Sequence, residues 1–446
     1  MEPNCAIGDI PGENVKKSMF FVYFFMGIAT LIQLLLDSSV ISILSFIILT
    51  FICFYSIDFD ILHPFVWFVP VFTIYSISFP LLFILGATEY YFTKETLLLE
   101  WLALCVFIVT TGNKQVSYNK LLLTKKSELI IVILYVVTIL LTLLQVIFIV
   151  SLGYTTKISI AQSNNFFIVM GRFASNGLII PSIFLYLQPK ATAKIRIWHF
   201  SIGLMVLSLA FLASGDRSVV LKYILTYVFL YNVTYKKIKI STFTVMGILG
   251  LSLVAIMSPL KMFIANGFIA VTSPERSFFI DILYSEFYAA SFNLNYLLLM
   301  QDLWNYRLGS TLIYDLLSPF DLLNVNPFNI NNFSAVYWNQ STFWKTSTSG
   351  MGFTLVGEGY LNFGIIGIVI WYVFIALFVK WFYFKSNKSN YRFVLYLLLI
   401  SVMLYSNRAD LANIFSPFFK YGILPIVLIE IITNIKRKQK QGVNFL

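Results

Sequence analysis

The chain is a succession of long apolar stretches separated by polar segments. A helix needs ~17–25 apolar residues to cross a bilayer, and twelve stretches approach or exceed that length. They are Met19–Leu36, Val40–Tyr55, Ile61–Leu85, Thr96–Thr111, Leu129–Leu152, Phe166–Leu187, Trp198–Ala213, Val219–Tyr231, Phe243–Leu260, Phe353–Val379, Phe393–Tyr405 and Phe415–Ile435. The eighth and eleventh are the shortest. The pattern predicts an all-α polytopic membrane protein with about twelve transmembrane helices.

Composition supports a membrane protein and excludes a soluble domain. The 446 residues are 59% hydrophobic and 11% charged, with a mean hydropathy of +0.83. Soluble domains carry about 25% charged residues. The polar N-terminus lacks the features of a cleavable signal, so the first span is expected to serve as an uncleaved membrane signal. The three cysteines indicate neither a disulfide framework nor a metal site, and no cofactor is expected.

The basic residues predict how the chain is oriented. With a cytoplasmic N-terminus, 20 of the 31 Lys and Arg residues fall on the cytoplasmic side and seven on the opposite side. Cytoplasmic loops carry an excess of Lys and Arg, so both termini are predicted to be cytoplasmic. The net charge of +11 therefore reports membrane topology and does not indicate a nucleic-acid partner.

This orientation divides the chain into five parts. Residues 1–18 form a cytoplasmic tail, 19–260 carry the first nine spans, and 353–435 carry the last three. A basic cytoplasmic tail follows at 436–446. The remaining segment, 261–352, is one long loop on the outer side, and loops of this length are usually functional.

The long loop is expected to be partly helical. Ser273–Met300 reads as a helix with Ser273 as its N-cap and Pro274 in its first turn, and it contains Asp281 and Glu286. The rest, Gln301–Gly352, is rich in Asn and aromatic residues. Aromatic faces stack on sugar rings and Asn binds hydroxyls, but an aromatic belt resting on lipid explains the same composition.

Glu358 is the most informative carboxylate in the chain. It lies in Thr354–Ile370, where the polar loop meets an apolar helix, and Asn362 follows four residues later on the same helical face. An ionisable group at the edge of a span is costly and is usually functional. A Glu solvated among lipid head groups is the alternative. Tyr360 and Asn362 are further candidates for substrate binding.

Four arginines are predicted near the outer membrane surface, and guanidinium groups there suit a lipid pyrophosphate because they bind phosphate bidentately and stay charged. Arg172 lies about two turns into the sixth span, with Ser175 and Asn176 on its face and no acidic neighbour in sequence. Gly177 and Pro181, which follow it, can break that helix. The others are Arg217, Arg276 and Arg408. Arg217 could instead pair with Asp216, Arg408 with Asp410, and Arg276 with lipid head groups.

A general base must reach a substrate hydroxyl from the outer side. Glu358, Glu286 and Asp281 are the candidates there. His63 and His199 map to the cytoplasmic ends of spans and are predicted to be structural.

Three motifs resemble the Wzy-type O-antigen and oligosaccharide repeat-unit polymerases. One is the run GEGYLNFG, Gly357–Gly364, leading into a late span. Another is Ser214–Ser218 between adjacent spans, where Gly215 allows a tight turn. This motif departs from the usual pattern by Gly215-Asp216 before the arginine. The third is Tyr306–Thr311, followed by Leu316–Phe320 in the outer loop. The resemblance covers most of the chain.

The resemblance implies a GT-C-like membrane glycosyltransferase that works without a metal. It would join undecaprenyl-pyrophosphate-linked oligosaccharide units at the outer face of the bacterial cytoplasmic (inner) membrane, making O-antigen or capsule-type polysaccharide. Membrane lipid and a chain-length regulator protein are the other expected partners. Glu358 or Glu286 would take the proton of the attacking hydroxyl, and the four arginines would hold the pyrophosphate.

Two other functions stay open from the sequence. An O-antigen ligase shares the lipid donor and one large outer loop, but it is expected to use a His in that loop, where this chain has none. A lipid-linked oligosaccharide flippase or other transporter would show repeated halves or charged residues along many spans. The chain shows no repeat.

Overall fold

The computed structural model describes residues 12–36, 38–118, 128–153, 160, 163, 165–188, 191–250, 252, 278–320, 333–338 and 352–432. All regular elements among these residues are helical. The helices of the first two thirds of the chain are α1 (Gly12–Leu35), α2 (Ser39–Ser56), α3 (Pro64–Ile84), α4 (Lys94–Thr111), α5 (Glu128–Ser151), α7 (Phe166–Gly177), α8 (Ile179–Tyr186), α9 (Ala193–Ser214), α10 (Arg217–Thr234) and a helix over Ile240–Gly250.

The later elements include several short helices before the last long ones. The short elements are α12 (Phe278–Ile282), η2 (Leu283–Phe287), α13 (Tyr288–Leu299), η3 (Gln301–Leu303), α14 (Ser310–Leu317), η4 (Ser318–Phe320) and α15 (Ser334–Val336). The chain then forms α16 (Leu355–Ser386), α17 (Asn390–Ser406), α18 (Ala412–Phe418) and η7 (Phe419–Ile423). The predicted helix at Ser273–Met300 is confirmed from Phe278 onward, and its predicted start lies outside the described residues.

A polytopic membrane architecture is confirmed, although the predicted number of twelve spans is not. Among the described residues, seven helical segments are long and apolar enough to cross a membrane: Ser39–Ser56, Pro64–Ile84, Leu129–Ser151, Phe166–Tyr186, Ala193–Ser214, Leu355–Ser386 and Ala412–Ile432. The other five predicted spans coincide with α1, α4, α10, the Ile240–Gly250 helix and α17. These helices are shorter or more polar, so length and composition alone do not assign them to the membrane.

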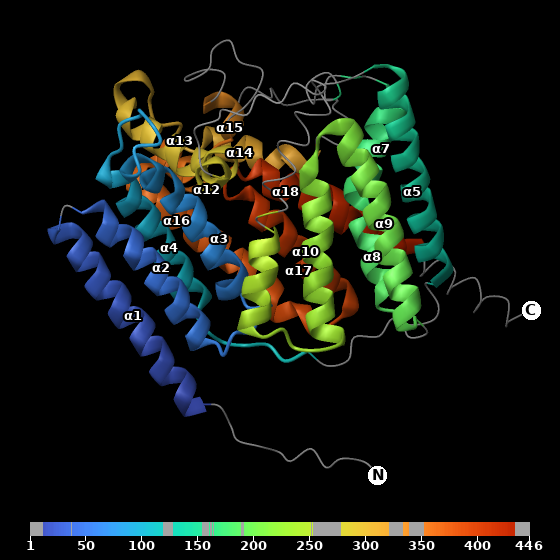
Figure 1. Cartoon of the computed structure of the whole chain (residues 1–446), viewed down its shortest axis with the longest axis horizontal. Coiled ribbons are helices and arrows are strands. Elements are labelled where there is room, and N and C mark those ends of the chain that lie inside the picture. Colours follow the sequence, from blue (N-terminus) through green and yellow to red (C-terminus); the bar gives the residue numbers. More distant parts are fainter. Residues whose placement is uncertain are drawn as a thin grey trace, which may run out of the picture.

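The helices form one bundle with the short elements gathered at one end (Figure 1). Helices α1 and α2 lie at one side of the bundle and α5, α7 and α9 at the other, with α10 and α17 between them. Helices α12, α13, α14 and α15 lie at the upper end of the bundle in this view. Buried apolar side chains from most of these helices form one large core.

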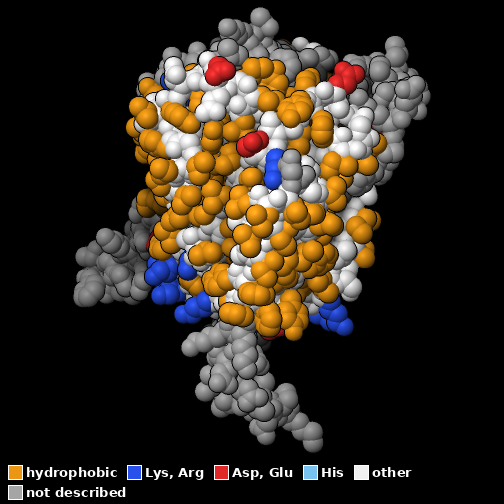
Figure 2. Space-filling view, turned by 90° about the vertical axis from the view of Figure 1, so that its left-hand side faces the viewer, with side chains coloured by type: hydrophobic (Ala, Val, Ile, Leu, Met, Phe, Trp, Pro, Cys, Tyr) orange, Lys and Arg blue, Asp and Glu red, His pale blue; other side chains and the backbone are white. Residues whose placement is uncertain are grey.

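The outer surface of the bundle is apolar over most of its height. Figure 2 shows hydrophobic side chains covering the visible face, with Lys and Arg side chains gathered near its lower edge. Exposed large apolar side chains on the long helices include Phe20 and Phe24 of α1 and Ile366 of α16. Such a belt is what a lipid-facing surface requires, because apolar patches of this size are rare on soluble monomers.

Two of the predicted spans are interrupted. Gly177 and Pro181 were expected to break the sixth span, and α7 does end at Gly177 before α8 begins at Ile179. The tenth span contains a break that the hydrophobic pattern did not indicate. Phe363 and Gly364 have non-helical backbone angles, with Gly364 at φ 62°, in the left-handed region that favours glycine.

The break in α16 folds its first two turns back against the rest of the helix. A Cβ added to Gly367 would collide with the carbonyl oxygen of Gly359, and a Cβ on Gly359 would lie 3.0 Å from the Cα of Ile368. Eight residues along a straight helix span about 12 Å, so this contact requires the reversal. The two glycines allow the backbones to touch. Leu355–Asn362 is therefore a separate short helix beside the span that starts near Ile365.

The segment between the ninth and tenth predicted spans is fixed to the bundle through asparagine side chains. Asn295 of α13 accepts hydrogen bonds from the Thr93 N–H (2.8 Å) and from the hydroxyls of Thr93 and Thr96 (both 3.1 Å). Asn293 accepts one from Trp338 Nε1 (3.0 Å). Both side chains are buried. These two asparagines hold α13 against the rest of the protein.

Candidate functional site

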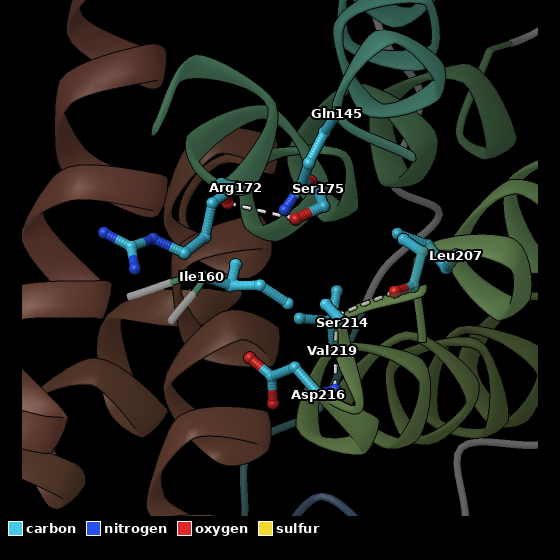
Figure 3. A pocket seen from close by; sticks show the side chains of 9 residues that line it. Gln145, Ile160, Arg172, Ser175, Leu207, Ser214, Asp216 and Val219 are labelled. Atoms are coloured by element: carbon cyan, nitrogen blue, oxygen red, sulfur yellow. Dashed lines mark hydrogen bonds between the residues drawn. The ribbon is translucent and has the colours of Figure 1, made fainter. Parts of the chain in front are cut away.

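A small cavity brings together two motifs that are far apart in the sequence. It has a volume of about 50 Å³ and lies between α5, α7, α9 and α10. Its polar lining residues are Gln145, Arg172, Ser175, Ser214 and Asp216, and its apolar lining residues are Ile160, Leu207, Ala210 and Val219. In Figure 3 the side chains of Arg172 and Asp216 lie on opposite sides of Ile160. Arg172 and the Ser214–Ser218 turn, predicted separately, therefore form one site.

Local sequence explains how α7 presents Arg172. Asn165 caps the helix, accepting hydrogen bonds from the N–H groups of Phe167 (3.0 Å) and Ile168 (3.3 Å). Arg172 follows two turns later and is partly exposed. Gly171 lets α7 approach α5 closely, because a Cβ there would collide with Gln145 and come within 2.6 Å of the Leu141 carbonyl oxygen. This close approach brings Gln145 to the cavity wall beside Arg172.

The opposite wall is the tight turn between α9 and α10. Gly215 ends α9 in the left-handed conformation (φ 69°), as its position in the motif predicted. Asp216 then caps α10: its Oδ1 accepts hydrogen bonds from the Ser218 N–H (3.3 Å) and the Ser218 hydroxyl (2.9 Å). The next residue, Arg217, is the first of α10 and is half-buried.

The side chain of Arg172 extends toward the C-terminal helices. Figure 3 shows its guanidinium pointing away from Ser175 and toward the brown ribbon of the last part of the chain. Phe173 stacks edge-on against Tyr421 of η7 at 5.1 Å between ring centres, and the charges of both Arg172 and Asp216 act on the Tyr421 hydroxyl. Element η7 therefore lies next to α7, on the side to which the Arg172 guanidinium points. A guanidinium with hydroxyl and amide neighbours can bind an anionic group such as a phosphate.

Glu358 lies in a different place and has no solvent contact. Its Oε2 accepts hydrogen bonds from the Leu411 N–H (3.0 Å) and Trp371 Nε1 (3.3 Å), and its Oε1 lies 3.3 Å from the Ser334 hydroxyl. The side chain is fully buried, so it is not a Glu solvated among head groups. Three chain segments meet at this carboxylate, which therefore ties the outer-loop helix α15 to α16 and to the start of α18.

Two further acids surround Glu358. Ser334 Oγ lies 2.6 Å from Asp315 Oδ2, and the Asp315 side chain also hydrogen-bonds Glu358. Burial raises the pKa of Asp315 well above its ordinary value, and the charges of Asp410 and Glu358 raise it further. Burial also raises the pKa of Asp410, although hydrogen bonds from Ala335 and Asn413 oppose the shift. Burial therefore favours the protonated form of Asp315, which can donate a hydrogen bond to Glu358.

Asn362 connects the same helix to the turn before α14. Its Oδ1 accepts hydrogen bonds from the Gly309 N–H (3.0 Å) and the Thr311 hydroxyl (3.1 Å), and its Nδ2 donates to the Glu358 carbonyl oxygen (2.8 Å). The break after Asn362 leaves carbonyl oxygens without helical partners, and the Leu361 carbonyl accepts from Arg307 N–H (3.0 Å). The predicted shared face of Glu358 and Asn362 is confirmed, and it serves to dock the outer loop.

Tyr360 lies on the other face of this short helix. Its ring centre is 6.2 Å from those of both Trp304 and Tyr306. Tyr306 is exposed, whereas Tyr360 and Trp304 are buried. The guanidinium of Arg307 stacks over the ring of Tyr337 at 4.3 Å. The exposed ring of Tyr306 is compatible with sugar binding, and the role of the buried Tyr360 in binding stays a prediction.

The remaining predicted residues are dispersed. Asp281 is exposed on α12, and Glu286 lies on η2. Arg408 is half-buried in the α17–α18 turn, where its carbonyl oxygen accepts a hydrogen bond from the Phe353 N–H (2.9 Å). Arg276 lies outside the described residues. His63 has the predicted structural role, because its Nδ1 caps α3 by accepting from the Phe65 N–H (3.1 Å).

Sequence reasoning missed the acids that accompany Glu358. Asp315 lies between the two quoted runs Tyr306–Thr311 and Leu316–Phe320, and nothing near it in sequence signals burial. Asp410 was considered only as a partner for Arg408, whereas it caps α18 and holds the Ala335 N–H (3.0 Å). Glu100 of α4 was passed over inside an apolar span, and it is also buried. A charged residue inside an apolar stretch was the available signal for Glu100.

Comparison with known proteins decides the family. The model of the family described as O-antigen polysaccharide polymerase Wzy matches residues 15–440. The chain belongs to this Wzy family. Membership gives it a polymerase role in O-antigen polysaccharide synthesis, acting on lipid-linked oligosaccharide repeat units, and makes it a multi-pass membrane protein. No curated protein and no solved structure gives a match, so the predicted GT-C likeness of this Wzy protein stays a prediction.

Proposed function

We propose that this Wzy protein joins undecaprenyl-pyrophosphate-linked oligosaccharide units at the outer face of the cytoplasmic membrane, and that the Arg172 cavity receives the pyrophosphate. The cavity carries the proposal because Arg172 of α7 lines it together with Ser214 and Asp216 of the α9–α10 turn. At about 50 Å³ it has room for a few water-sized groups. It therefore suits phosphate oxygens, and the sugars would lie outside it.

The reaction in this proposal is a single displacement. A hydroxyl of the incoming unit attacks the anomeric carbon of the growing chain, a new glycosidic bond forms, and the bond to the lipid pyrophosphate breaks. Arg172, with Arg217 at the turn beside it, would stabilise the charge that develops on the leaving pyrophosphate. The family pattern implies no resident metal, because the guanidinium groups supply the positive charge. Polymer formation is then expected to continue in the presence of EDTA.

The proton of the attacking hydroxyl requires a carboxylate at the outer side, and the three predicted candidates differ in access. Asp281 is exposed and could reach a substrate without any rearrangement. Glu358 is fully buried, with its oxygens engaged by Leu411, Trp371 and Ser334. Acting as a base would require Glu358 to leave those partners. Glu286 lies on η2, one turn from Asp281.

The test is the surface glycan of a deletion strain complemented with variants. We expect Arg172→Ala to collapse the polymer ladder to a single repeat unit. The amount of polymer should fall at least ~100-fold relative to the parent, while the protein remains in the membrane. Arg172→Lys should restore part of the ladder because it keeps the charge but loses the bidentate fork. Arg196→Ala is the matched control. Arg196 lies at the end of α9 opposite Ser214, with its guanidinium carbon 5.1 Å from the ring centre of Tyr186.

The outcomes separate the proposal from its competitors. Full-length polymer from Arg172→Ala would contradict the role of the cavity. A bare core with accumulated lipid-linked polymer in the deletion strain would indicate a ligase. Single units trapped on the cytoplasmic side would indicate a flippase.

A further inference from the structure

Helix α14 has the opposite polarity to that expected of a helix in an aqueous loop. Its polar residues Thr311 and Asp315, four positions apart on one face, are completely buried. Its apolar residues point outward: the side chain of Ile313 is 58% exposed, and Leu316 is exposed as well. The flanking residues Leu308 and Phe320 are also exposed. A helix at a water interface normally buries its apolar face and exposes its polar one.

The buried polar face is held by specific hydrogen bonds. Thr311 bonds Asn362 (3.1 Å), and Asp315 bonds both Ser334 and Glu358. The register is regular, because Thr311 and Asp315 are four residues apart and so are Asn362 and Glu358. Helix α14 therefore runs alongside the fold-back part of α16 in the opposite direction. This pairing fixes which face of α14 is left outside.

The depth of α14 follows from the same contacts. Glu358 bonds Trp371 Nε1, and Trp371 lies seven residues beyond Gly364 in the apolar span, about 10 Å along the helix at 1.5 Å per residue. Asp315 and Leu316 lie at the level of Glu358. At the other end of α14, the ring of Phe320 is 6.0 Å from that of Phe419, which lies inside the span Ala412–Ile432. Both contacts place α14 beside membrane-spanning helices.

The exposed apolar face of α14 continues into the lipid-facing belt. The Phe363 ring approaches Gly309, with 3.1 Å between its tip and an added Cβ. Phe363 is itself exposed, and the next residues, Ile365 and Ile366, are among the exposed apolar side chains of α16. The exposed apolar side chains of α16 thus reach Gly309, which is next to the exposed Leu308 at the start of the outer-loop helix.

We propose that α14 is embedded in the apolar part of the membrane and that its face of Leu308, Ile313, Leu316 and Phe320 contacts the acyl chains of bilayer lipids. Lipid satisfies the apolar side chains, while Asn362, Ser334 and Glu358 satisfy the polar face that lipid would leave without partners. The outer-loop segment is then part of the membrane domain rather than an aqueous lid. The inference does not depend on the role of Arg172.

Spin-label accessibility in proteoliposomes tests the contact. Single cysteines at Ile313 and Leu316, in a chain whose native cysteines are replaced, would carry a nitroxide. Collision with oxygen, which concentrates in the bilayer, is compared with collision with a water-soluble nickel chelate present on both sides. Ile366 serves as the lipid-facing reference and the exposed Asp302 as the polar reference. Because all four side chains are exposed, the label needs no space in the core.

We expect the labels at Ile313 and Leu316 to match the label at Ile366, with oxygen accessibility several-fold above nickel accessibility. Nickel accessibility equal to that at Asp302 would overturn the proposal, because α14 would then face water. Low accessibility to both reagents would also overturn it, since the face would be covered by protein. Spin–spin broadening in that case would identify a second copy of this chain as the cover.

Discussion

The Arg172 cavity and the Glu358 cluster are both polar regions inside an apolar bundle, but their polar groups are used differently. At Glu358 the carboxylate oxygens are engaged by Leu411, Trp371 and Ser334, and no solvent reaches them. At the cavity Arg172 is partly exposed, and the buried Oε1 of Gln145 accepts no hydrogen bond. A polar group whose partners all come from the protein holds the fold, whereas an unsatisfied one beside a cavity is available to a ligand. Variants in the two regions should therefore fail in different ways.

The largest loss of stability is expected from Glu358→Ala. Removing the carboxylate leaves the Leu411 N–H and the Trp371 indole without their acceptor in a buried place, which costs about 3 kcal/mol or more. Less protein should accumulate in the membrane, and the melting temperature of the purified protein should fall. The melting temperature is measured by thermal unfolding of the purified protein in detergent, followed by fluorescence.

Glu358→Gln separates a structural role from a catalytic one. It keeps the shape and one acceptor oxygen, so polymer should fall only in proportion to the amount of folded protein. Loss of all polymer at normal protein level and melting temperature would instead show that Glu358 acts as the base.

The next largest loss of stability is expected from Gly367→Ala, because it disrupts the fold-back of α16 that supports the Glu358 cluster. The new Cβ would collide with the Gly359 carbonyl oxygen and lie 3.0 Å from the Phe363 Cβ. Overpacking of this kind costs about 1–3 kcal/mol. Gly27→Ala in α1 is the control, since nothing lies within 4 Å of its Cβ position. Equal melting temperatures for the two variants would contradict the observed reversal of α16.

A substitution in the Arg172 cavity should lower polymer formation without lowering stability, in contrast to the variants of the Glu358 cluster. Gln145→Leu removes an oxygen that has no hydrogen-bond partner, so the melting temperature should stay the same or rise. Polymer formation should drop several-fold if the amide contributes to binding in the cavity. The measurement is the glycan ladder normalised to protein in the membrane. A lower melting temperature with normal polymer formation per protein molecule would instead show that Gln145 has a structural role.

The smallest effect is expected at Asp315 and depends on pH. Because the folded protein keeps the Asp315 proton above the ordinary carboxyl pKa of about 3.9, the unfolded chain releases its proton first as pH rises. Stability should therefore fall with rising pH above about 4, until the raised folded pKa is passed. Asp315→Asn mimics the protonated form and should weaken this fall. Melting temperatures between pH 5 and pH 8 test it, with Asp302→Asn as the exposed control.

The pattern of apolar stretches determined much of this protein. It predicted a polytopic helical membrane protein, and the glycines and prolines marked the end of α7 at Gly177 and the turn at Gly215. These features are local, because a run of apolar residues suffices to favour a membrane helix and a glycine suffices for a tight turn. The motifs around Glu358, Arg217 and Tyr306 also indicated the Wzy family, which the family match confirms.

Only the tertiary structure decided what those motif residues do for one another. The break at Phe363–Gly364 lies inside one predicted span, Phe353–Val379, and it brings Gly359 into close contact with Gly367. The burial of Asp315, Asp410 and Glu358 in one cluster joins segments up to 95 residues apart, which no spacing rule predicts. The same is true of the cavity between Arg172 and Asp216. A linear pattern specifies helices, while contacts between distant helices decide whether a polar residue is saturated or free to bind.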